Sequence, residues 1–205
     1  MRNNALIILV KPPELGKVKT RLAATLGNDK ALTIYKRLLE YTQSITKDLE
    51  ADLFVYYADK IIVDDIWSDG NYQKKVQKGA DLGERMSTAF KEVFDLGYAK
   101  VTAIGSDCIE LKKEIIEAGF QALKNNNCTI GPALDGGYYL IGLSDFDTSV
   151  FSNISWSTSE VFNQTKNNLS KLNWTYQSLK ALSDLDDIED FNKLPEQTKK
   201  YLLNE

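Results

Sequence analysis

The stretch Val101-Thr-Ala-Ile-Gly-Ser-Asp107 decides the fold. Its first four residues favour a strand and the run ends at a glycine, which is typical of a buried parallel strand leading into a helix, here over 109–123. Ligands of open α/β sheets bind just outside the carboxyl ends of the strands, so Asp107 is expected where a ligand would lie. A carboxylate there suits a divalent cation that also contacts phosphate. Asp is equally a good helix cap, and the stretch alone leaves both roles open for Asp107.

Strand and helix patterns alternate along the rest of the chain. Further strands are predicted at 5–10, 52–58, 128–132, 138–143 and 174–179, with a weaker one at 74–77. Helices are predicted over 22–45, 82–94, 160–169 and 196–203. The continuous apolar run at 5–10 indicates a strand covered on both faces. A length of 205 residues fits one domain, or one domain with a small appendage.

Composition excludes several classes of protein. The net charge of −4 argues against a nucleic-acid-binding surface. No apolar run approaches the ~20 residues that a membrane span needs. The first predicted strand begins too early to leave room for a signal peptide, and two cysteines are too few for a disulfide framework. We therefore expect a cytoplasmic protein with neither a membrane span nor a nucleic-acid partner, and its oligomeric state stays open.

The chain contains no histidine. This excludes Ser-His-Asp and Cys-His catalysis, histidine metal sites and acid/base chemistry by imidazole. Any chemistry must use carboxylates, Lys, Arg, Tyr, hydroxyl groups, backbone amides and a bound hard cation.

The segment between the first predicted strand and helix is rich in basic residues. It carries Lys11, Lys17, Lys19 and Arg21 together with prolines and Gly16. A loop of this kind can offer backbone amides and cations to phosphate, although it matches neither a P-loop nor a G-x-G-x-x-G motif. A solvated loop is the usual explanation for a charge cluster, but the position after the first strand favours phosphate binding.

Acidic residues recur near the expected ligand edge, each with a structural alternative. Asp135 lies at the tip between two predicted strands, where Asp-Gly is also a common hairpin turn. Five acids between 183 and 190 suit the first turn of a helix, or else Asp184 or Asp186 faces Asp107 and shares its cation. Arg85 follows a predicted capping box and has no local role, so its direction, into a cleft or outward, stays open.

Taken together, these motifs resemble the CofC-like glycosyltransferases of the DUF2064 type, a bacterial family within the nucleotide-diphospho-sugar transferase superfamily. The residues that carry the resemblance are Lys11-Pro-x-x-x-Gly16-x-x-Lys19-Thr20-Arg21-Leu22, Asp81-Leu-Gly-Glu-Arg-Met86, Gly105-Ser-Asp107, Gly131-Pro-Ala-x-Asp-Gly-Gly-Tyr-Tyr-Leu-Ile-Gly142, Trp156-Ser-Thr158 and Asp184-Leu-Asp186. They span most of the chain. Two positions depart from the family pattern: Ile109 replaces a usual proline and Asp187 replaces a threonine.

The resemblance implies a GT-A-type, Rossmann-like α/β fold, a three-layer sandwich with a mostly parallel central sheet formed by one domain over 1–205. It implies a nucleotide near the carboxyl ends of the first strands and Asp107 as a metal ligand. The Asp184-Leu-Asp186 segment can supply a second carboxylate, for which Asp186 is the candidate, although the choice between Asp184 and Asp186 stays open. The residues expected to bind the nucleotide are Lys11, Gly16, Lys19, Arg21 and Arg85.

These inferences lead to one functional hypothesis and two alternatives. The hypothesis is a glycosyltransferase that requires Mg²⁺ or Mn²⁺ and moves a sugar from a nucleotide-diphosphate sugar to a small-molecule acceptor. Asp107 and Asp135 are the catalytic candidates, with Asp135 orienting or deprotonating the acceptor hydroxyl. The acceptor loop is expected to comprise Tyr138, Trp156, Ser157 and Thr158. The alternatives are a CofC/MobA-like nucleotidyltransferase, which joins a nucleoside triphosphate to a phosphorylated acceptor and releases pyrophosphate, and a non-catalytic nucleotide-binding regulator.

Overall fold

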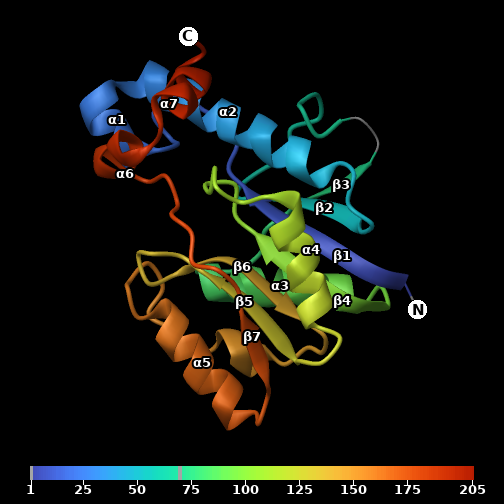
Figure 1. The fold of residues 1–205 in the computed structure, drawn as a ribbon. Coiled ribbons are helices and arrows are strands. Elements are labelled where there is room, and N and C mark those ends of the chain that lie inside the picture. The colour runs from blue at the N-terminus through green and yellow to red at the C-terminus, as the bar shows by residue number, and fades with distance from the viewer. Residues whose placement is uncertain (1, 69–70) are drawn as a thin grey trace.

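A seven-stranded sheet is the centre of the structure, a computed structural model that describes residues 2–68 and 71–205. The strand order within the described residues is β3-β2-β1-β4-β6-β5-β7 (Figure 1). The strands are β1 (Arg2–Val10), β2 (Asp52–Tyr57), β3 (Tyr72–Val76), β4 (Tyr98–Ile104), β5 (Cys128–Pro132), β6 (Tyr138–Leu143) and β7 (Tyr176–Ser178). Each predicted strand is present, with β1 and β4 longer and β7 shorter than predicted.

The sheet is mostly parallel. Strand β1 pairs in parallel with β2 and β4, β2 with β3, and β5 with β7. The antiparallel pairs involve β6, which lies between β4 and β5. The carboxyl ends of β1, β2 and β4 therefore meet at one edge, as the family resemblance implied.

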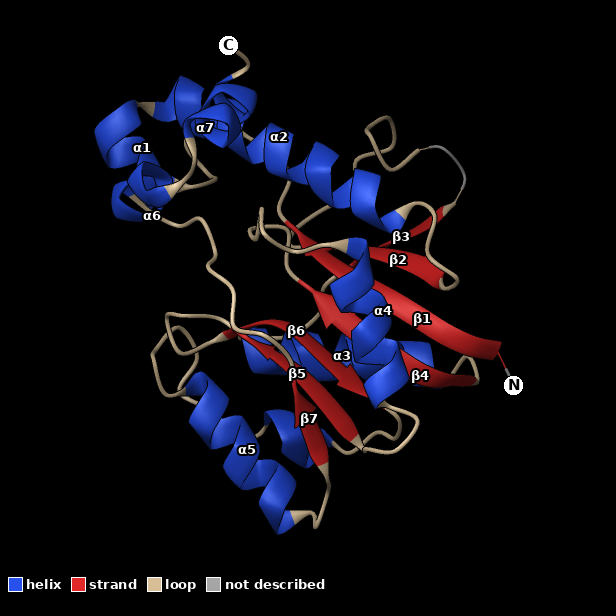
Figure 2. Cartoon of the chain, in the orientation of Figure 1, coloured by secondary structure: helices blue, strands red, loops and turns tan. Residues whose placement is uncertain are grey.

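Helices cover both faces of the sheet, which confirms the three-layer α/β sandwich (Figure 2). One face packs against α2 (Asn28–Thr46) and α4 (Lys113–Ala122), and the other against α3 (Leu82–Phe94) and α5 (Val161–Lys171). The remaining helices are the 3₁₀ helix η1 (Thr148–Phe151), α1 (Thr20–Leu26), α6 (Ile188–Lys193) and α7 (Glu196–Leu203). Alternate residues of β1 serve the two layers: Leu6 and Ile8 pack on one side, Ala5 and Ile7 on the other. No helix among the described residues has both the length and the apolar character that crossing a bilayer requires.

The helix predicted over 22–45 is wrong in one respect: it is two helices. Helix α1 ends at Leu26 and α2 begins at Asn28, because Gly27 between them has φ 86°, outside the helical region. Hydrophobic periodicity continues across the break, so the pattern did not reveal it. Leu22 of α1 then packs with Leu185 and with α6 and α7 in a cluster separate from the two faces of the sheet.

The structure also separates the two roles left open for Asp107. Helix α4 begins at Lys113, and its N-cap residue, Lys112, makes no side-chain capping bond. Asp107 therefore lies too early in the chain to cap this helix. By contrast, Asp81 caps α3 as predicted, because it accepts from the Glu84 N–H at 2.9 Å. The predicted capping box is only half formed, since Glu84 accepts from the Ala80 N–H at 2.8 Å and not from that of Asp81.

Gly131→Ala should destabilise the fold. The Tyr139 ring covers Gly131 in β5, so an added Cβ would overlap that ring. Overpacking of this kind costs about 1–3 kcal/mol of unfolding free energy, measurable by urea denaturation. Gly105→Ala is the control, because nothing lies within 4 Å of a Cβ built there. Equal losses in the two variants would contradict the role assigned to the Tyr139–Gly131 contact.

Candidate functional site

A pocket of about 440 Å³ opens at the carboxyl ends of β1 and β4. This volume is within the range of small-molecule sites. The predicted site residues that line it are Lys11, Lys19, Arg21, Arg85, Asp107, Tyr138 and Asp186, and Asp184 lines it as well. Gly16, Asp135, Trp156, Ser157 and Thr158 are not among the lining residues.

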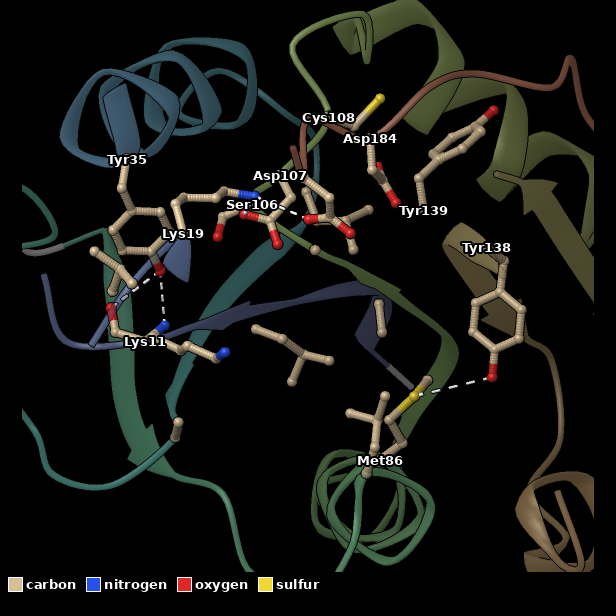
Figure 3. Close-up of a pocket in the computed structure, with 18 of the residues that line it drawn as sticks. Lys11, Lys19, Tyr35, Met86, Ser106, Asp107, Cys108, Tyr138, Tyr139 and Asp184 are labelled. Carbon is tan, nitrogen blue, oxygen red and sulfur yellow. Dashed lines mark hydrogen bonds and ion pairs between the residues drawn. The ribbon is translucent and has the colours of Figure 1, made fainter. Parts of the chain in front are cut away.

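Asp107 faces the amino end of α1 across the pocket. It follows β4 after the short Gly105-Ser106 turn, and its carboxylate is 43% exposed. Its Oδ1 atom is buried, has no hydrogen-bond partner among the described residues, and is contacted by Lys19 Nζ at 2.7 Å in an ion pair (Figure 3). The sequence did not predict this pair.

Lys19 is held deep beside the carboxylates. Its side chain is only 5% exposed, and its Nζ atom also contacts the Leu185 carbonyl oxygen at 2.7 Å and Asp186 Oδ1 at 3.3 Å. Burial alone would lower the pKa of Lys19, but the negative charges of Asp107 and Asp186 outweigh it and raise the pKa. Lys19 is therefore an ammonium ion. Its backbone is in the left-handed region, with φ 47° and ψ 43°, an uncommon conformation for a residue other than glycine.

The C-terminal carboxylates enter the pocket on an extended segment, residues 179–187, which we name the strap. Figure 1 shows it running from β7 past the sheet to α6. The Leu185 N–H donates to the Asp107 carbonyl oxygen at 2.9 Å, and the Leu182 N–H donates to the Pro132 carbonyl oxygen at 3.1 Å. Leu185 packs among α1, α6 and α7 while its neighbours line the pocket. In an extended segment alternate side chains share a face, so Asp-Leu-Asp places Asp184 and Asp186 together.

This alternation brings both candidate acids of the strap to the pocket. Both Asp184 and Asp186 line the pocket, and Asp187 is the N-cap of α6 in a capping box with Asp190. The acidic stretch therefore contributes two residues to the pocket and the N-cap of a helix, and the sharing of a cation stays a prediction. Burial, together with the charges of Asp107 and Asp186, raises the pKa of Asp184 to about 7.

The remaining basic side chains of the pocket are less constrained. Arg21 is 70% exposed and lies 3.4 Å from Asp187. Arg85 donates from Nε to the Gly79 carbonyl oxygen at 3.2 Å and is among the residues that line the cleft. Tyr35 fixes the Lys11 backbone: its hydroxyl accepts from the Lys11 N–H at 2.8 Å and donates to the Lys11 carbonyl oxygen at 3.1 Å (Figure 3).

Two predicted residues have turn-forming roles outside the pocket. Asp135 lies at the exposed tip of the β5–β6 hairpin, where its Oδ1 accepts from the Gly137 N–H at 2.9 Å. Its charge is near enough to contribute to the raised pKa of Asp184. Gly16 has φ 73° in the first loop, a conformation that favours glycine.

The predicted acceptor loop lies beside the pocket. Tyr138 lines it and packs edge-on against Trp156, with 6.3 Å between ring centroids. Trp156 fits against Gly83 of α3, where an added Cβ would overlap the indole, and lines a neighbouring groove. Ser157 has φ 63°, and the Thr158 hydroxyl donates to the Ser155 carbonyl oxygen at 2.7 Å. These two residues shape the loop.

The carboxylates of the pocket fit a divalent metal ion whose coordination is completed by water and substrate. Among the described residues no group of three or more His, Cys, Asp or Glu side chains is arranged to hold a metal ion alone. Mg²⁺ in phosphate sites, however, usually takes one or two carboxylates and leaves its other positions to water and phosphate. Asp107 and Asp186 supply hard oxygen ligands of this kind. Within the part of the chain that the structure describes, the Lys19 ammonium is the only charged partner of Asp107 Oδ1.

Cysteine labelling should report on the strap. Cys108 is buried beneath it, with its Sγ donating to the Ser183 carbonyl oxygen at 3.5 Å, and burial together with the Asp184 charge raises the pKa of Cys108 to about 12. Both thiols should resist a disulfide reagent at pH 8 until urea unfolds the chain. Leu185→Ala should loosen the strap and speed labelling of Cys108 but not of Cys128, which lies in β5. Immediate labelling of Cys108 in the unmodified protein would contradict the packing described.

Comparison with known proteins identifies relatives of this chain. The model of a family described as "Uncharacterized protein conserved in bacteria (DUF2064)" matches residues 41–158. The solved structure of a candidate nucleotide-diphospho-sugar transferase from Desulfovibrio desulfuricans G20 is 34% identical, covers 96% of this chain and 87% of its own, and has a TM-score of 0.88. A search of curated proteins finds no match.

More distant structures share the fold. The inositol-1-phosphate CTP transferase from T. maritima is 11% identical, covering 98% of this chain and 95% of its own with a TM-score of 0.59. The 4-diphosphocytidyl-2C-methyl-D-erythritol synthase from Anaerococcus prevotii DSM 20548 is 12% identical, covering 92% of each chain with a TM-score of 0.58. The family match over more than half of the chain, together with the 34% identity to the D. desulfuricans protein, shows that this chain belongs to the DUF2064 family, as its motifs predicted.

Proposed function

We propose that this protein is a metal-dependent transferase that uses a nucleotide-activated donor, and that it moves a sugar from a nucleotide-diphosphate sugar. The observation that carries the proposal is the convergence of Asp107 and Asp186 with basic side chains in one pocket at the carboxyl ends of parallel strands. The chemical demand of such a transfer is to stabilise negative charge on a departing diphosphate. Carboxylates that can hold a cation, next to Lys and Arg, meet that demand.

The proposed roles follow from where each side chain lies. Mg²⁺ or Mn²⁺ on Asp107 and Asp186 would supply Lewis-acid stabilisation of the leaving diphosphate. Lys11 and Arg85 would bind phosphate oxygens, since both line the pocket and neither is in an ion pair within the described residues. Asp135 does not line the pocket but lies near Asp184, and would act on an acceptor hydroxyl that reaches the hairpin tip, orienting it or accepting its proton. The Tyr138–Trp156 pair would form the wall of the acceptor site.

Nucleotidyl transfer is the second candidate. Two structures with the same fold belong to proteins named for CTP transfer or for a diphosphocytidyl product. A nucleotidyltransferase would use the same carboxylates and cations but break the bond between the α- and β-phosphates, releasing pyrophosphate. A non-catalytic nucleotide-binding regulator is the remaining alternative, and the retained carboxylates argue against it.

A thermal-shift panel should identify the donor class. The panel compares nucleoside triphosphates, nucleoside diphosphates and nucleotide sugars, each with Mg²⁺ or Mn²⁺. A ligand at about 100 times its dissociation constant adds ~2.7 kcal/mol to the unfolding free energy. For a chain of this size that corresponds to a rise of roughly 5–10 °C in melting temperature.

The pattern of response separates the candidates. A glycosyltransferase should respond to the diphosphate and the sugar conjugate of one base, with the metal required for the full shift. A nucleotidyltransferase should prefer a triphosphate and release pyrophosphate with its acceptor. A regulator would shift without releasing either product. No shift from any ligand, with folded protein, would count against a ready-formed nucleotide site.

Asp107→Asn should abolish metal-dependent turnover. An amide has nearly the shape of a carboxylate but is a poorer cation ligand, and a metal supplies several kcal/mol of transition-state stabilisation, so we expect a loss of roughly a hundredfold or more in kcat. Asp147→Asn is the control, because Asp147 caps η1 through the Ser149 N–H, and Asn caps as well as Asp. Full activity of Asp107→Asn at matched metal concentration would remove Asp107 from the mechanism.

A further inference from the structure

We propose that the Lys19 ammonium acts as a built-in cation at the metal-binding carboxylates, and that a divalent ion must displace it before the site is loaded. The inference rests on the proposed function, because it assigns a further role to a residue of the same pocket. It makes Lys19 the residue that determines how tightly the protein binds metal in the absence of a donor.

The first support is the nature of the Lys19 contacts. Its Nζ atom contacts one oxygen each of Asp107 and Asp186 and the carbonyl oxygen of Leu185, at 2.7, 3.3 and 2.7 Å. Carboxylate and carbonyl oxygens are also the ligands that hard divalent cations take in proteins. The ammonium therefore occupies an all-oxygen position that would otherwise attract a metal ion.

The second support is the direction from which each group can be reached. The Lys19 side chain is 5% exposed, whereas the carboxylates of Asp107 and Asp186 are 43% and 41% exposed. A metal ion in the pocket can thus reach the carboxylates without first opening the protein. It would then lie close to the ammonium, and the repulsion between two cations in a partly buried site favours release of Lys19.

The third support is that the Lys19 side chain can change partners without movement of its backbone. Its backbone is fixed at the amino end of α1, where its carbonyl oxygen accepts from the Ala23 N–H at 2.8 Å. Its four-carbon side chain carries a point charge that can rotate to a new anion. Lys11 and Arg85 line the same pocket, so a phosphate bound there lies within a basic surface that a released Lys19 would join.

The test is a titration of the protein with Mn²⁺ in the absence of nucleotide. The concentration of free Mn²⁺ is measured from its electron paramagnetic resonance signal. Lys19→Met should bind Mn²⁺ at least tenfold more tightly than the unmodified protein, because the competing cation is gone. Lys11→Met is the matched control: it removes a positive charge from the same pocket but not from the carboxylates, and should change the affinity less than threefold. Lys19→Arg keeps a cation and should keep weak binding.

The outcomes are distinguishable from failure of the proposed function. Three results would overturn the proposal that a metal ion displaces Lys19. They are an unchanged Mn²⁺ affinity in folded Lys19→Met, an equal gain of affinity in Lys11→Met, and no Mn²⁺ binding by any variant. If Lys19→Met fails to fold, Lys19→Gln keeps a donor for the Leu185 carbonyl oxygen and is judged by the same tenfold criterion. The Mn²⁺ titration contains no nucleotide donor. A negative result would therefore not bear on the proposed transferase function, which the thermal-shift panel tests separately.

Discussion

The ion pair between Lys19 and Asp107 is the interaction on which the site depends. A buried ammonium is costly unless it is paired and hydrogen-bonded, and Lys19 meets this condition only where three segments converge: the amino end of α1, the turn after β4, and the strap. The turn is fixed by the pairing of β4 in the sheet, and the strap is fixed to that turn by the bond from the Leu185 N–H to the Asp107 carbonyl oxygen. Together, the contacts of Lys19 join residues near both ends of the chain to the turn after β4.

The sheet explains why these segments meet. Parallel pairing of β1 with β2 and β4 brings their carboxyl ends to one edge, so the loops after β1 and β4 are neighbours although almost ninety residues separate Lys19 from Asp107. The antiparallel β6 then turns the chain back, and β5 pairs with β7 so that the strap leaves the sheet toward the same edge. The strap is bonded to the β5–β6 hairpin by the parallel bridge between Ala133 and Leu182. This bridge directs the residues that follow toward Asp107.

The sequence predicted the framework better than the pairing of charges. Apolar runs such as 5–10 and the glycine-terminated strand before Asp107 are local signals, and local signals specified nearly every strand and helix. Gly27 was missed because hydrophobic periodicity is blind to a single residue with positive φ. The position of Lys19 was missed because its partners are distant in sequence, and a basic loop looks the same whether its cations meet phosphate or carboxylate. The alternation in Asp184-Leu-Asp186 did contain the information that both acids share a face.

The strap also has a consequence for how the protein is made. Chains emerge from the ribosome amino end first, so the residues of β1, β2 and β4 are made before the strap is synthesised. Until residues 184–186 arrive, Lys19 lacks the Leu185 carbonyl and Asp186, two of its three oxygen contacts. Completion of the pocket is therefore among the last events of biogenesis. A chain stopped or cut within the strap before residue 185 would contain the residues of every strand but would lack two of the three oxygen contacts of Lys19.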